Sequence, residues 1–135
     1  MSLGSWDPKA ANAETNFSID RKVLERFLEI SQHQQLDQLD EKLSAEDQQI
    51  QAGLMTQDKH SWFAVAESFS DEELGQLMRF FTLAEKLPGW EAGDKSPVIW
   101  LGKILKKRGT GIDRELLLWI KANTNNQYLP HGSLL

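Results

Sequence analysis

The sequence of 135 residues contains no cysteine. This absence excludes disulfide bonds, thiolate catalysis, cysteine-bound zinc and iron–sulfur clusters. No apolar run approaches the ~20 residues that a membrane-spanning helix needs, and the N-terminus lacks the apolar core of a secretory signal. We therefore expect a cytoplasmic protein, and we interpret residues 1–3 as a candidate expression-vector remnant.

The sequence also lacks the alternation of apolar and polar residues that predicts strands, and it shows no internal repeat. Its length fits one domain, and 40% hydrophobic with 26% charged residues is an ordinary globular composition. We predict an all-α fold with a single compact domain of about five to six helices, including a C-terminal helical hairpin. The helical domain covers residues 17–126, between a flexible N-terminal arm at 1–16 and an extended C-terminal tail at 127–135.

The clearest helix start lies at Ser70, which forms a capping box with Glu73. The apolar residues that follow predict a helix over residues 71–87, stopped by Pro88. The apolar face of this helix is unusually wide, which predicts a central position in the domain.

Two apolar helices are predicted near the C-terminus. Pro97 follows a serine suited to the N-cap and begins the first helix, and Gly109 ends it. Thr110 and Asp113 have the spacing of another capping box and predict the start of the second helix. We expect the two to form a tight hairpin over residues 97–123.

The N-terminal half contains weaker helical patterns. Apolar residues between Ser18 and Ile30 follow the spacing of an amphipathic helix, and another helix is expected around Trp62 and Ala66. Residues 32–54 fit either one long bent helix or two shorter ones.

Charge is distributed unevenly along the chain. Residues 1–75 carry 15 acidic and 6 basic residues, a net charge of −9, whereas residues 76–135 carry 5 acidic and 9 basic residues, a net charge of +4. This asymmetry predicts a polarised molecule whose acidic and basic faces either orient partners or pack together within the monomer.

The basic residues of the first C-terminal helix are a candidate binding site. Lys103, Lys106 and Lys107 share one helical face, and Arg108 lies at the helix end. They predict a site for nucleic-acid backbone, a phosphorylated ligand or an acidic protein. The competing interpretation is structural, because cations near a helix C-terminus complement its macrodipole.

Two apolar positions accompany these lysines. Ile99 and Gly102 fall among them on a helical wheel and predict a small apolar notch that receives a partner. Alternatively, the tail covers the notch through Tyr128 and Leu129, because an aromatic ring beside an aliphatic side chain suits docking in a groove.

Trp90 lies in the loop between Pro88 and Gly93. A large ring in a loop either fills the core or stands exposed as a binding anchor, so Trp90 is also a candidate partner-binding residue.

No catalytic constellation is visible in this sequence. Asp37, Asp40 and Glu41 lie near His33, but a solvated acidic face explains them, and no glycine-rich phosphate loop or nucleophile elbow is present. We predict no catalytic residue, no metal site and no cofactor. Residues 116–120 are too apolar to read DNA bases from a groove.

These observations favour a non-catalytic protein–protein interaction module over an enzyme. The expected contact surface is the apolar segment 116–120, the tail and Trp90, and the expected partner is another protein or a second copy of the chain. The alternative is binding of nucleic acid or a phosphate ligand through the basic face of the helix at 97–108.

Overall fold

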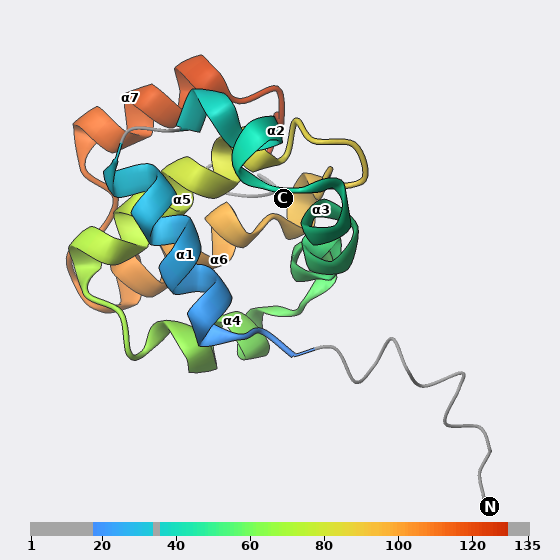
Figure 1. Cartoon of the computed structure of the whole chain (residues 1–135). Coiled ribbons are helices and arrows are strands. Elements are labelled where there is room, and N and C mark those ends of the chain that lie inside the picture. The colour runs from blue at the N-terminus through green and yellow to red at the C-terminus, as the bar shows by residue number, and fades with distance from the viewer. Residues whose placement is uncertain (1–17, 34–35, 130–135) are drawn as a thin grey trace, which may run out of the picture.

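The structure is a computed structural model that describes residues 18–33 and 36–129 (Figure 1). Within these ranges it contains α-helices and short 3-10 helices and no strand. In chain order the elements are α1 (Arg21–Gln32), η3 (Leu36–Gln38), α2 (Leu39–Lys42), α3 (Ala45–Gln51), η4 (Ala52–Thr56), α4 (Lys59–Ala66), α5 (Asp71–Ala84), η5 (Gly93–Lys95), α6 (Pro97–Lys107) and α7 (Arg114–Asn123).

The prediction of an all-α fold with one compact domain is confirmed. In the described part of the chain, α2 is a single turn of 4 residues, and each of the other α-helices has at least 7 residues. No described helix has both the length and the apolar character needed to cross a membrane.

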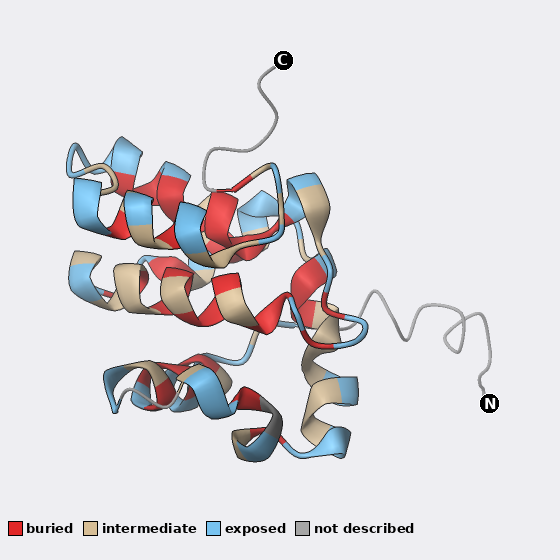
Figure 2. Cartoon of the chain, turned by 90° about the horizontal axis from the view of Figure 1, so that it is seen from above, coloured by how far each residue is buried: buried red, intermediate tan, exposed pale blue. Residues whose placement is uncertain are grey.

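Helix α5 occupies the predicted central position. It packs against α1, α6 and α7, and α6 packs in addition against α4. Figure 1 shows α5 between α1 and α7, and Figure 2 shows rows of helix with buried residues concentrated where neighbouring rows meet. Half of the α5 side chains are buried, so this helix is the centre of the core.

Aromatic rings join the helices around α5. Phe27 of α1 stacks on Phe80 with ring centroids 4.1 Å apart, and Trp62 of α4 meets Phe81 edge to face at 5.3 Å. Trp90, from the loop after α5, also packs on this cluster, and its ring centroid lies 6.4 Å from that of Phe27. All five rings are at most 1% exposed, so each contributes its full apolar area to the core.

The local start signals of α5 and α6 are confirmed. Ser70 accepts a hydrogen bond from the Glu73 N–H, and the Glu73 carboxylate accepts one from the Ser70 N–H. Pro97 opens α6 after its N-cap serine. Helix α5 ends at Ala84, three residues before the predicted end, because the following N–H groups of Lys86 and Leu87 bond three residues back, to Leu83 and Ala84, and Pro88 has no N–H to continue the helix.

The predicted start of α7 was wrong by three residues. Asp113, and not Thr110, is the N-cap, because its carboxylate accepts from the Leu116 N–H at 2.8 Å. The Thr110 hydroxyl instead donates to Asp71 of α5 at 2.6 Å. Helices α6 and α7 both pack against α5.

The weaker N-terminal patterns resolve into short elements. Helix α1 begins at Arg21 rather than Ser18, since Asp20 supplies the N-cap and accepts from Lys22 N–H. Residues 36–56 form α2 and α3 with flanking 3-10 turns, so the alternative of one long bent helix is wrong.

Only the first three residues of the predicted extended tail at 127–135 lie in the described part of the chain. Residues 127–129 form a turn rather than an extended strand, and Leu129 is buried with its N–H donating to the Asn126 carbonyl. Residues 130–135 and the predicted N-terminal arm at 1–16 lie outside the described residues.

Two buried tryptophans provide a stability test. The Trp90 indole N–H donates to the Gln48 carbonyl at 2.9 Å, whereas the Trp62 indole N–H has no partner among the described residues. Replacing either by Phe leaves a similar cavity, but only Trp90→Phe removes a hydrogen bond. Trp90→Phe should therefore lower the free energy of unfolding by about 1 kcal/mol more than Trp62→Phe. Urea titrations followed by circular dichroism measure the difference, and equal losses would contradict it.

Candidate functional site

A concave surface runs along the outer side of α5. Helices α1 and α7 both pack against α5 but make no contact of comparable extent with each other. The part of α5 between them is consequently open, and Gly75, Gln76, Arg79 and Leu83 are only partly buried there. We call this surface the α5 groove.

The α5 groove consists of two adjoining hollows that share Gln76 and Arg79. Their volumes are about 460 and 550 Å³, within the range of sites that receive a ligand or a peptide segment. The first is lined by Asp71, Glu72, Gly75, Gln76, Arg79, Leu105, Thr110, Gly111, Asp113 and Leu116. The second is lined by Ser31, Gln32, Leu36, Asp37, Gln76, Arg79, Leu83 and Trp119.

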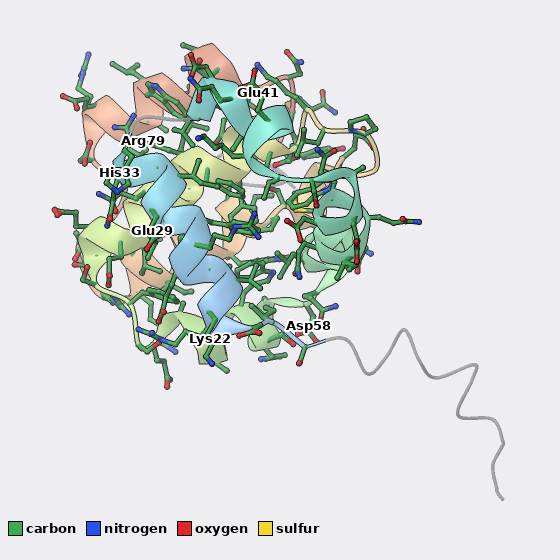
Figure 3. The ribbon with its side chains drawn as sticks, in the orientation of Figure 1. Lys22, Glu29, His33, Glu41, Asp58 and Arg79 are labelled. Carbon is green, nitrogen blue, oxygen red and sulfur yellow. The ribbon has the colours of Figure 1, made fainter. Side chains whose placement is uncertain are left out.

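Arg79 lies where the two hollows meet. Its guanidinium carbon is 4.9 Å from the centroid of the Trp119 ring, a cation–π contact between α5 and α7. Its ion pair with Glu115 is long at 3.9 Å, and the Glu115 side chain is 91% exposed, so this pair contributes little. Arg79 lines the second hollow together with Ser31 and Gln32 of the last turn of α1, and Figure 3 labels it in that region.

The α1 side of the groove is tied to its floor. Gln32, in the last turn of α1, donates from its amide to the Gln76 side chain of α5 at 3.0 Å. Leu36 follows on η3 and packs against the core while remaining partly exposed. The groove therefore has an apolar wall beside a polar floor.

A three-residue network closes the first hollow at the start of α5. Arg108 donates to the Asp71 carboxylate at 2.8 Å and to the Phe69 and Ala66 carbonyls at 3.0 and 3.1 Å. The Thr110 hydrogen bond, followed by those of Arg108 and its charge, lowers the pKa of Asp71 below its usual range. Arg108, a predicted ligand contact, thus ties the end of α6 to the segment between α4 and α5.

The three lysines of the predicted basic face all lie exposed on α6. Lys106 and Lys107 lie in its last turn, where they complement the macrodipole. No ion pair of Lys103, Lys106 or Lys107 occurs within the described ranges. The structure therefore separates these lysines from Arg108, which points to α4 and α5.

The other predicted site residues belong to the core. Ile99 is 1% exposed and Trp90 is fully buried, so neither side chain reaches the surface in this structure. The notch expected at Gly102 is filled by Ile112, whose Cδ1 atom lies 3.0 Å from where a Cβ on Gly102 would be. Ile112 from the α6–α7 turn, and not the tail, covers that position.

The predicted contact surface on α7 is largely inward. Leu116 and Ile120 are buried, Trp119 packs partly against the core, and only Leu118 is highly exposed, at 52%. The apolar residues of α7 thus pack into the core on one side of the helix, and Leu118 is the large side chain among them that remains exposed.

A buried carboxyl group forms a second notable cluster beyond the end of α5. Glu85 accepts hydrogen bonds from the Ser96 hydroxyl at 2.5 Å and from the Asn126 amide at 2.9 Å. The same Asn126 amide donates to the Gly93 carbonyl at 2.8 Å, and Ser96 also accepts from the Val98 N–H at the start of α6. Glu85 thereby joins α5, α6 and the segment that follows α7.

Burial raises the pKa of the Glu85 carboxyl above its ordinary value, and the nearby Glu91 charge adds to this. Hydrogen bonds from Ser96, Asn126 and the Ala92 backbone oppose the shift without cancelling it. Glu85 also lines a cleft of about 610 Å³ between Thr82 and Tyr128. Since the donors of these hydrogen bonds belong to the chain itself, we interpret Glu85 as a structural residue that links the segments carrying Ser96 and Asn126.

The acidic side chains near His33 do not assemble into a site. Asp37 and Glu41 are exposed, and the side chain of Asp40 lies outside the description. Across residues 18–33 and 36–129, no three histidine or carboxylate side chains come together as metal ligands would. Comparison with protein-family models, curated proteins and solved structures found no match to this chain.

The α5 groove was missed by sequence reasoning. The signal was present, because Gly75, Gln76 and Arg79 interrupt the wide apolar face of α5 on one side. To recognise it as a groove one must know that α1 and α7 flank this side of α5, and that arrangement depends on contacts between distant segments.

The pH dependence of stability should reveal Glu85. Because its pKa is raised in the folded protein, the folded state holds more protons than the unfolded chain between about pH 4.3 and that raised pKa. The free energy of unfolding therefore falls as pH rises through this window, by at most about 1.4 kcal/mol per pH unit. Glu85→Gln does not titrate, so it should gain stability relative to the wild type across the same window.

Urea titrations at stepped pH values measure this relative gain. Asp94→Asn, which removes an exposed carboxylate from the same loop, is the control and should leave the slope nearly unchanged. A constant difference between Glu85→Gln and the wild type at every pH would show that Glu85 has an ordinary pKa.

Proposed function

We propose that this protein is a non-catalytic interaction module that receives a segment of a partner protein along the α5 groove. The observation that carries the proposal is the groove itself, a continuous surface with partly exposed Leu36, Leu83 and Trp119 beside polar floor residues. Apolar walls with a few fixed polar groups are typical of peptide-binding grooves.

The dimensions of the groove suit one segment of chain. From Glu72 to Leu83 it follows α5 for roughly 16 Å at 1.5 Å per residue. A helix laid between α1 and α7 would contact both walls at its i, i+3 and i+7 positions. Leu118 extends the apolar surface of α7 and is a candidate for contact between two copies of the chain. A cytoplasmic location remains part of the proposal.

Selection from a displayed peptide library tests the groove. Peptides selected on the wild type should bind Gln76→Trp at least tenfold more weakly, on the order of the 1.4 kcal/mol that a blocked floor position removes. Gln49→Trp, at an exposed position on α3, is the matched control and should bind as the wild type does. Binding measured by fluorescence anisotropy reports both variants.

The proposal fails if no selected peptide distinguishes Gln76→Trp from Gln49→Trp. Sedimentation over a concentration series tests the version in which the partner is a second copy. Association that Leu118→Asp abolishes would support that version, and a monomer at all concentrations would eliminate it.

A second candidate function is binding of nucleic acid or a phosphorylated ligand by α6. The observation in its favour is that Lys103, Lys106 and Lys107 are exposed on one face, without an ion pair to any described residue. Their target would be backbone phosphate, which lysine contacts as a point charge. The participation of Arg108 in the fold reduces this face to three cations.

Anisotropy with labelled single- and double-stranded DNA and RNA at about 50 mM salt tests this candidate, because phosphate contacts are strongest at low salt. The triple change of Lys103, Lys106 and Lys107 to Glu should abolish binding. Reversing Lys22, Lys59 and Lys86 to Glu is a control with the same net charge. Equal effects of the two triple variants, or no binding by the wild type, would rule the candidate out.

A further inference from the structure

The charges along the α5 groove are predominantly acidic. Asp37 lies in the second hollow, and Glu72 and Asp113 lie in the first. All three side chains are exposed, and none forms an ion pair with another described residue. The remaining acid of the lining, Asp71, is already paired with Arg108.

Arg79 is the single cation in the lining of the two hollows. It lies between the acidic ends, where Trp119 supports its guanidinium from one side. Glu115 next to it is almost fully exposed and adds a further negative charge at the rim. The groove thus has negative ends and a centre of mixed cationic and aromatic character.

We propose that the segment received by this groove is basic and amphipathic, with cationic side chains near Asp37 and Glu72 and an apolar side chain over Arg79 and Trp119. This inference rests on the proposed interaction function and specifies its partner. Three unpaired carboxylates against one arginine make the local potential attractive to lysine and arginine. Leu36 and Leu83 beside Asp37 supply contact area for the apolar side.

The position of Arg79 gives the partner a register. A cation of the bound segment opposite Arg79 would meet a like charge, which disfavours any register that places lysine or arginine at the centre. The favoured segment therefore has cations separated by an apolar stretch rather than a continuous basic run. A polybasic segment without apolar residues fits this groove less well.

Two labelled probes distinguish the charge of the partner. Both are amphipathic peptides of about 15 residues with the same leucine face, and the polar face carries lysine in one and glutamate in the other. The wild type should bind the lysine peptide at least about tenfold more tightly than the glutamate peptide at low salt. The preference should shrink as salt screens exposed charges.

Charge reversals locate the binding. The double variant Asp37→Lys with Glu72→Lys should weaken binding of the lysine peptide by about tenfold, because two attractive charges near the peptide are lost. The control is Glu46→Lys with Glu67→Lys, which changes net charge equally at exposed positions outside the groove and should stay within about twofold of the wild type. Glu46 matches Glu72, because both lie in the first turn of a helix. Arg79→Gln should tighten binding of the lysine peptide, because it removes a like charge from the groove.

Each contrary result overturns the inference in a recognisable way. Equal weakening by the two double variants would mean that the lysine peptide responds only to total charge. Tighter binding of the glutamate peptide, lost in Arg79→Gln, would reverse the partner's charge while leaving the proposed interaction function standing. Absence of binding by both peptides would reject a basic amphipathic partner, whereas the interaction function is decided separately by Gln76→Trp. The neutral pair Asp37→Asn with Glu72→Gln provides the same comparison if the reversals unfold the protein.

Discussion

The burial of two adjacent aromatic residues on α5 is the constraint on which the rest of the fold depends. Neighbouring residues of a helix point about 100° apart, so Phe80 and Phe81 are both removed from water only if α5 is covered on two sides. Phe27 of α1 covers the first and Trp62 of α4 the second. Helices α1, α6 and α7 then pack around α5, whose apolar face is too wide to be covered from one side.

Coverage of α5 is incomplete because the helix is not apolar all round. Gly75 allows Leu116 of α7 to approach, with 3.4 Å between a Leu116 methyl carbon and the position of a Cβ on Gly75. One turn later Arg79 needs access to water for its charge, which keeps α1 and α7 apart at that level. The α5 groove is therefore a consequence of the sequence of α5 rather than of a loop.

Local signals in the sequence predicted the fold better than the site. The caps at Ser70 and Ser96 involve partners within three residues, so spacing alone identified them. Arg108 and Glu85 hydrogen-bond to residues 37 to 42 and 11 to 41 positions away, respectively, so no window of sequence shows their partners. The misplaced cap at Thr110 has the same origin, because its hydroxyl is taken by Asp71 across the fold.

The location of the groove also links binding to stability. Helices α1 and α7 each pack more extensively against α5 than against each other, so a segment in the groove would add contacts that bridge them. Any ligand that binds the folded state alone raises the free energy of unfolding by mass action. Glu85 and Asn126 hold the chain after α7 to the end of α5, so both ends of α7 lie next to segments that pack on α5. For the proposed segment, walls that are already held in place would lower the entropic cost of binding, since fewer side chains and helices would have to be fixed on docking.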